Sequence, residues 1–242
     1  MPALTPTHRA IAIDMLGYGY TDHARGGVYS TPIWVDFLKA FIDALGFEKV
    51  SFVGNSFGGA MTLAFAVRYP ERVKNFVLMG AAGLKFNVKA NVIFAGPEKK
   101  VVPALNFKFV PSLENMRTLV RQFYYNPDLV DGVELEEIVE HRHRLSIRPS
   151  EQEDRRKMFP GTPQDTMDML STPDDQIAAI PHKVLICHGR EDNAVPVRSA
   201  VRMNELILRS QLHVFGQCGH WAMMEHRDRF NALISQFFNE KD

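Results

Sequence analysis

The chain has 242 residues, of which 45% are hydrophobic and 23% charged, as in ordinary globular proteins. Lysine plus arginine equals aspartate plus glutamate at 28 each, which excludes the basic excess expected of a protein that binds nucleic acid. Two cysteines are too few for a disulfide scaffold, and no apolar run approaches the ~18 residues of a membrane span. We therefore expect a soluble cytoplasmic protein that contacts neither nucleic acid nor membrane. A homo-oligomer is compatible with this composition.

Short apolar runs alternate with helical patterns in the first third of the chain. Thr31, followed by Pro32, is the expected N-cap of a helix, and Gly46 would end that helix. Strands bounded by turns and separated by helices are typical of a parallel sheet that is buried on both faces. The expected strands are residues 9–14, 49–53 and 75–79, and a second helix is expected over residues 58–69.

The pattern changes between residues 86 and 172, where strands are no longer expected and prolines interrupt helical stretches at 113–124 and 133–145. The alternation resumes with strands at 183–188 and 211–215 and with helices at 197–208 and 226–238. We therefore predict an α/β core made of residues 1–85 and 173–242. Residues 86–172 are predicted to form a helical cap inserted into that core.

A G-x-S-x-G motif at Gly54, Ser56 and Gly58 lies between a predicted strand and a predicted helix. Such a turn is sharp, so small residues must flank the serine, and it exposes the hydroxyl at the carboxyl end of the sheet. The amide of Phe57 would begin the helix and could donate to a developing oxyanion. The motif predicts Ser56 as a nucleophile. The alternative is a glycine-rich turn that only packs a helix against a strand.

A serine hydroxyl needs a base to take its proton, and in folds with this turn the order along the chain is serine, acid, histidine. Asp192 follows the predicted strand at 183–188 and is the candidate acid, with the adjacent Glu191 as the alternative. His220 follows the last predicted strand, between Gly219 and Trp221, and is the candidate base. The three motifs together favour a serine hydrolase.

Other reactive side chains have simpler interpretations. His141 and His143 are two residues apart on a predicted helix and would point to different faces, which disfavours a metal site. Cys218 is interpreted as a loop thiol rather than as a second nucleophile.

Several segments resemble the meta-cleavage product hydrolases, which cleave carbon–carbon bonds in bacterial aromatic catabolism on an α/β-hydrolase fold with a helical cap. The resembling segments are DMLGYGYTD from Asp14, VGNSFGGA from Val53, HGREDNAVP from His188 and QLHVFGQCGHWAMMEH from Gln211. The resemblance maps the nucleophile, acid and base onto Ser56, Asp192 and His220. It also implies that Asn55 and Trp221 line the site and that Arg142 lies near the dienol end of the substrate.

The resemblance implies a dienoate substrate of the 2-hydroxy-6-oxohexa-2,4-dienoate type, such as 2-hydroxymuconate semialdehyde, and no cofactor. Carbon–carbon cleavage leaves a carbanion, and an arginine such as Arg142 would stabilise the charge as it spreads over a dienolate. Two alternatives stay open. One is a carboxylesterase on the same scaffold, and the other is an inactive truncated fragment or binding protein.

The sequence departs from the family at two places. Relatives have further strands before residues 9–14 and an H-G-x-G loop that supplies a second oxyanion amide, so the resemblance implies that N-terminal strands are missing here. The stretch 86–110 is also longer than expected for the family, which bears on the acyl group that the cap would accept.

Overall fold

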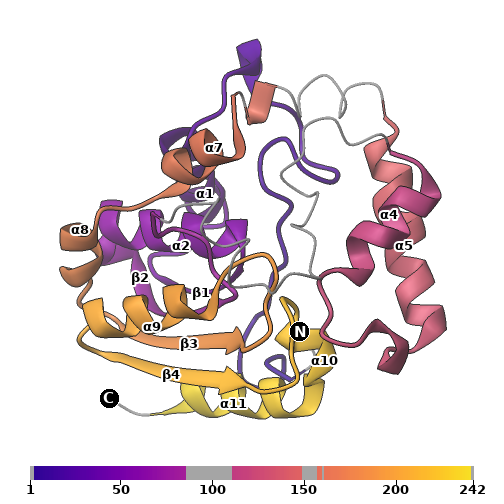
Figure 1. The fold of residues 1–242 in the computed structure, drawn as a ribbon. Coiled ribbons are helices and arrows are strands. Elements are labelled where there is room, and N and C mark those ends of the chain that lie inside the picture. Colours follow the sequence, from indigo (N-terminus) through magenta and orange to yellow (C-terminus); the bar gives the residue numbers. More distant parts are fainter. Residues whose placement is uncertain (1–2, 86–110, 149–156, 160, 241–242) are drawn as a thin grey trace.

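The computed structural model describes residues 3–85, 111–148, 157–159 and 161–240. Its centre is a parallel sheet of four strands that lie side by side in chain order (Figure 1). Because parallel neighbours cannot be joined by a tight turn, helices connect them across the sheet. The strands are β1 (Val50–Asn55), β2 (Val73–Met79), β3 (Lys183–Gly189) and β4 (Ser210–Phe215).

Alternate side chains of β3 enter different cores, as expected for a strand that is covered on both faces. Val184 and Ile186 belong to the larger cluster, whereas Leu185 and Cys187 belong to a second cluster on the opposite face. The larger cluster is built with α1 (Thr31–Ala44), α2 (Phe57–Arg68), α8 (Asp174–Ala178) and α9 (Val197–Leu206). The second is built with α10 (Ala222–Glu225) and α11 (Arg227–Asn239), and α11 lies below the sheet in Figure 1.

These elements confirm the predicted α/β fold with a parallel sheet. The predicted stop of α1 is also correct, since Gly46 takes a φ of 71° just after the helix. Ser30, and not Thr31, occupies the N-cap, and Thr31 is the first helical residue. The described residues also include short 3₁₀ turns at Arg25–Gly27, Pro70–Arg72 and Pro127–Leu129.

Residues 9–14 were predicted as a strand, and this prediction is wrong. A strand is maintained by a ladder of hydrogen bonds to a neighbour, and no strand among the described residues lies beyond β1 at that edge of the sheet. The segment is irregular, and its apolar side chains divide: Ile13 packs against the core while Ile11 is 42% exposed. It ends in a turn in which the Asp14 carboxylate accepts a 3.0 Å hydrogen bond from the amide of Tyr20.

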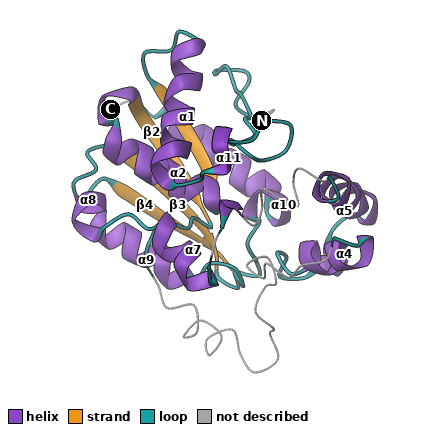
Figure 2. Ribbon diagram, turned by 90° about the horizontal axis from the view of Figure 1, so that it is seen from above, coloured by secondary structure: helices purple, strands orange, loops and turns teal. Residues whose placement is uncertain are grey.

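Two helices from the predicted cap stand together, apart from the sheet (Figures 1 and 2). They are α4 (Leu113–Arg121) and α5 (Gly132–Ser146), and side chains of Ser112 and Asp131 cap their N-termini. Their facing apolar side chains form a cluster of their own that also includes Trp221. The helix α7 (Pro163–Leu170), from the same predicted region, packs instead into the larger core cluster.

No helix in the described ranges is long and apolar enough to cross a membrane. The expected extra length at 86–110 lies outside the described residues.

Candidate active site

Ser56 lies alone between the end of β1 and the start of α2, in a backbone conformation that non-glycine residues rarely adopt. Its φ is 52° and its ψ is −114°. A conformation of this kind costs about 1–3 kcal/mol and persists only where the surroundings impose it. The surroundings here are the end of β2, because the Ser56 amide donates to the Met79 carbonyl at 3.1 Å and the Ser56 carbonyl accepts from the Ala82 amide at 3.0 Å.

The glycines around the serine do not contribute equally. A Cβ atom on Gly54 would lie 2.5 Å from the Gly58 carbonyl oxygen, and one on Gly59 would lie 2.4 Å from the Ala81 Cβ. A Cβ atom on Gly58 would meet nothing within 4 Å. The close approach of α2 to β1 therefore requires Gly54, and its close approach to the segment that follows β2 requires Gly59. The expectation that small residues must flank Ser56 is correct for Gly54 and wrong for Gly58.

Asp192 and His220 meet in a fully buried pair. The Asp192 Oδ2 atom lies 2.7 Å from the His220 Nδ1 atom, while Oδ1 accepts hydrogen bonds from the amides of Ala194 at 2.8 Å and Val195 at 2.9 Å. Burial raises the pKa of Asp192, but the charge and hydrogen bond of His220 outweigh it and leave the pKa below its usual range. The carboxylate therefore stays charged and can orient the imidazole.

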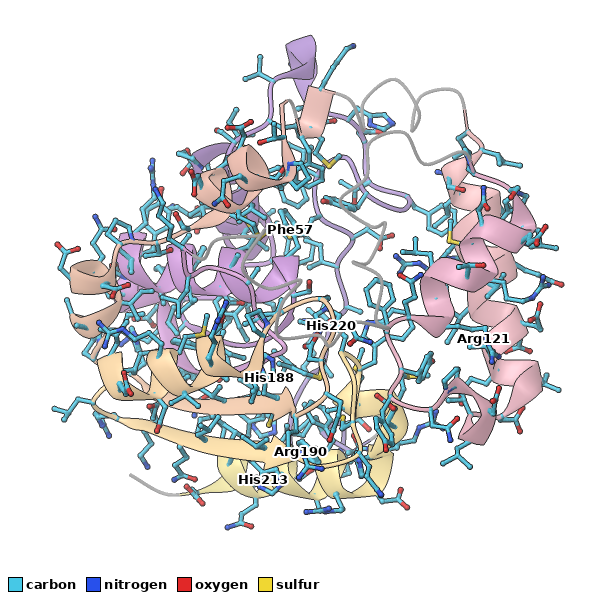
Figure 3. All side chains as sticks on the ribbon, in the orientation of Figure 1. Phe57, Arg121, His188, Arg190, His213 and His220 are labelled. Atoms are coloured by element: carbon cyan, nitrogen blue, oxygen red, sulfur yellow. The ribbon has the colours of Figure 1, made fainter. Side chains whose placement is uncertain are left out.

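The end of β2 brings Ser56 and this pair to the same edge of the sheet. Gly80 follows the residue to which the Ser56 amide is bonded, and a Cβ atom on it would lie 3.0 Å from His220 Nδ1 and 3.1 Å from Asp192 Oδ2. Figure 3 shows His220 between Phe57, beside the serine, and the helix pair α4–α5. Within the described contacts the Ser56 hydroxyl makes no hydrogen bond to His220, a bond that in many hydrolases tightens only when substrate binds.

The predicted alternative acid, Glu191, does not contact the imidazole. One of its oxygens lies 2.7 Å from the Arg190 Nε atom, and the other accepts a 3.1 Å hydrogen bond from the Cys218 amide. The structure thus places Asp192, rather than Glu191, against His220. Burial raises the pKa of the Cys218 thiol, so it stays protonated and is a poor nucleophile.

A second histidine, His188, contacts the acid, and sequence reasoning missed it. Its Nε2 atom lies 2.9 Å from the Val195 carbonyl and 3.3 Å from Asp192 Oδ2, and its side chain is 1% exposed. Burial lowers the pKa of His188, which keeps the ring neutral and lets Nε2–H donate to Val195. The sequence did contain a signal for this contact, because His188 lies at the end of a strand, four residues before Asp192.

The remaining predicted residues lie around this centre. Asn55 donates its side-chain amide to the Met79 carbonyl at 2.9 Å. Phe57 is the first residue of α2, whose first N–H groups have no partner within the helix and are open to an oxyanion. Trp221 is buried, and the Arg142 guanidinium lies over its indole, 5.7 Å from the ring centre. Arg142 is therefore brought next to the residue that follows His220.

No group of three or more histidine, cysteine or acidic side chains in the described part of the chain could hold a metal ion. His141 instead lies 3.2 Å from an Arg144 guanidinium nitrogen, and its ring is near that of Tyr20.

Comparison with known proteins places this geometry in a family. Residues 1–227 match the family described as the alpha/beta hydrolase fold. The chain is 41% identical to the 2-hydroxymuconate semialdehyde hydrolase of Pseudomonas putida, over 98% of this chain and 79% of that protein. It is 40% identical to a 2-hydroxy-6-oxo-2,4-heptadienoate hydrolase from the same species, over 100% of this chain and 82% of the relative.

Solved structures agree with these relatives. A meta-cleavage product hydrolase from Pseudomonas fluorescens superposes with a TM-score of 0.88 and 44% identity, over 100% of this chain and 83% of that one. A 2-hydroxy-6-oxo-6-phenylhexa-2,4-dienoate hydrolase from Rhodococcus gives a TM-score of 0.81 and 29% identity, over 99% of this chain and 83% of that one. The chain is therefore a hydrolase of the α/β-hydrolase family and belongs, within it, to the meta-cleavage product hydrolases.

Proposed function

We propose that this hydrolase cleaves a carbon–carbon bond in a meta-ring-fission product of the 2-hydroxy-6-oxohexa-2,4-dienoate type, such as 2-hydroxymuconate semialdehyde. Ser56 would be the nucleophile, Asp192 the orienting acid and His220 the base. One observation carries the proposal: a relative named for this activity is 41% identical over 98% of this chain. The cytoplasm suits this role, since the two buried cysteines are free thiols.

The reaction asks more of the protein than ester hydrolysis does. Cleaving a carbon–carbon bond expels a carbanion, which forms only if its charge spreads over a conjugated enolate. The dienol substrate would first be ketonised, and Ser56 Oγ would then attack the distal carbonyl. His220 takes the Ser56 proton and returns it to the leaving carbon as the bond breaks. Water then attacks the acyl-serine, again with His220 as base, and releases the acid.

Negative charge develops at two places in that sequence. The first is the carbonyl oxygen attacked by Ser56, where the free amide of Phe57 at the start of α2 would donate. The second is the enolate oxygen at the far end of the substrate. Arg142 is the candidate partner for it, because its guanidinium lies over Trp221, beside the base, and cannot lose its proton.

The aromatic side chains beside the base give the site an apolar wall. The ring of Phe123 lies 5.3 Å from the His220 imidazole and stacks on Trp221 at 4.7 Å. An apolar wall favours a planar conjugated substrate and excludes water from the breaking bond. We propose that α4 and α5 act as the cap of the site. Phe123 lies just after α4, and Arg142 lies on α5.

The test is to mix the purified chain with the yellow ring-fission product of catechol and to follow the loss of colour. We expect decolourisation that depends on the amount of protein and is absent with Ser56→Ala. If the colour persists while a p-nitrophenyl ester is hydrolysed, the chain is a carboxylesterase. If neither substrate reacts, the interpretation as a binding protein or inactive fragment is correct.

A further inference from the structure

The loop that carries His220, residues 217–220, has each of its backbone amides engaged by another part of the protein. The Glu191 carboxylate accepts from Cys218 at 3.1 Å and also bonds the amide of Gln217. The next amide, that of Gly219, donates to Glu225 Oε1 at 2.6 Å. The position of the loop therefore depends on two acidic side chains that do not belong to it. We call residues 217–220 the histidine loop.

Glu225 has a second contact that Glu191 lacks. Its other oxygen, Oε2, accepts a 2.7 Å hydrogen bond from the amide of Tyr125, in the segment that follows α4. The two amides that share this carboxylate are almost a hundred residues apart in the chain. One side chain thus joins the histidine loop to the helix pair α4–α5.

The two joined segments also touch directly. The His220 amide donates to the Phe123 carbonyl at 2.7 Å. A Cβ atom on Gly219 would lie only 2.4 Å from that same carbonyl oxygen, so a glycine is required for the approach. The Phe123 ring in turn lies 5.3 Å from the imidazole. The position of the His220 imidazole therefore depends on the two backbone segments that Glu225 joins, the histidine loop and the segment that follows α4.

Asp192 alone does not fix that position. Its carboxylate holds Nδ1 of the imidazole and selects the tautomer, but the ring can still shift with its backbone. A base must lie within hydrogen-bond reach of the proton that it removes, and a misplacement of about 1 Å can cost on the order of 10²-fold in rate. Support for the backbone of the histidine loop is therefore a requirement of the chemistry.

The environment of Glu225 explains why a carboxylate is needed there. The side chain is half buried, and burial raises its pKa above the usual range, although hydrogen bonds from the amides of Gly219, Tyr125 and Asn126 lower it. Only an ionised carboxylate presents acceptors on both oxygens. A glutamine of the same shape has one acceptor and one donor, so one of the two amides would face an N–H group and lose its partner.

We propose that Glu225 is a positioning residue of this enzyme: by binding Gly219 and Tyr125 with one carboxylate, it holds His220 in place and couples the base to α4–α5. The inference rests on the proposed role of His220 as base. It does not depend on which substrate the enzyme cleaves.

The test compares Glu225→Gln with wild type and with Glu137→Gln, an exposed glutamate on α5. The main readout is the rate at which a fluorophosphonate probe labels Ser56 between pH 5 and 9, because labelling needs the base but not the natural substrate. Thermal melting and the kcat and KM for the ring-fission product are measured alongside. We expect Glu225→Gln to label roughly 10-fold or more slowly and to lose kcat rather than KM, while Glu137→Gln matches wild type.

A lower melting temperature with an unchanged labelling rate would overturn the proposal, because Glu225 would then serve stability alone. If Glu225→Gln does not fold, Glu225→Asp replaces it, since the shorter carboxylate can reach only one of the two amides; wild-type labelling by that variant would likewise overturn the proposal. A wild-type chain that is labelled but leaves the ring-fission product intact would contradict the proposed function only. A wild-type chain that is not labelled would remove the base role and this inference with it.

Discussion

The serine turn and the histidine loop hold their reactive groups by different physical means. Ser56 is held by the backbone itself, in a left-handed conformation fixed between β1 and α2, where Gly54 allows the helix to approach the strand. The histidine loop is irregular, and side chains from elsewhere hold it through Glu191 and Glu225. The serine turn is held by neighbouring residues at the cost of backbone strain. The histidine loop is held by charge-assisted hydrogen bonds to side chains outside the loop.

This difference suits the two roles. A nucleophile that forms and breaks a covalent bond must not move, and a strand-to-helix turn gives it a rigid support. A base must face both the serine and the leaving group during the reaction. The histidine loop is instead joined through Glu225 to Tyr125, in the segment that follows α4.

The largest expected effect comes from the serine turn. Ser56→Ala should lower kcat by about 10⁶, because the nucleophile and its partners work as a unit. Ser56→Gly should be equally inactive but more stable than Ser56→Ala, since glycine adopts a φ of 52° without the steric cost that alanine bears. Activity assays and thermal melting of the two variants check both statements.

Residual activity in Ser56→Ala well above that level would show that Ser56 is not the nucleophile. Equal melting temperatures for the alanine and glycine variants would show that the turn is not strained, which would remove the contrast with the histidine loop.

The next effect concerns Arg142, which separates carbon–carbon cleavage from ester hydrolysis. Arg142→Gln should slow cleavage of the ring-fission product by roughly 10²-fold, as for the loss of one charge-stabilising contact. Hydrolysis of a p-nitrophenyl ester should fall far less, because an ester has no enolate at its far end. The ratio of the two rates is the measurement.

Arg121→Gln is a matched control, because Arg121 lies on α4 and pairs with Asp128 rather than with Trp221. An unchanged ratio in Arg142→Gln would assign Arg142 to the solvated surface, where 5.7 Å from an indole it would contribute only a weak cation–π contact.

Sequence reasoning predicted the elements that depend on local pattern. The Ser56 turn, the strands β1 to β4 and the stop at Gly46 all follow from short-range signals such as glycine position and apolar periodicity. The strand at residues 9–14 was wrong because a strand needs a partner, which an apolar run cannot supply. His188 lies only four residues before Asp192, and sequence reasoning did not use that signal. Glu225 was missed because its contact with Tyr125 joins segments far apart in the chain, which no local pattern encodes.

A smaller effect tests whether the glycines of the serine turn differ as their surroundings suggest. Gly54→Ala should destabilise the protein by about 1–3 kcal/mol, because its Cβ would lie 2.5 Å from a backbone carbonyl. Gly58→Ala, in the open first turn of α2, should be neutral or stabilising by up to ~1 kcal/mol. Chemical denaturation of the two variants gives the comparison. Equal losses at both positions would mean that the motif is required as a whole and not through one contact.

The smallest effect is expected at His188, whose Nε2 atom lies 3.3 Å from the Asp192 oxygen that also faces His220. Burial lowers its pKa from 6.5 in the folded protein, so the unfolded chain binds a proton that the folded one rejects. The contribution of the neutral His188 ring to stability is therefore complete above pH 6.5 and is lost as the pH falls from there toward the folded-state pKa.

His188→Phe removes the titrating ring, so the melting temperature of this variant should fall by a few degrees less than that of wild type between pH 7 and 5. His182 and His213, whose pKa values burial also lowers, are present in both proteins and cancel in the comparison. A difference in melting temperature between the two proteins that stays constant across this interval would show that folding does not shift the pKa of His188, and that burial does not keep its ring neutral.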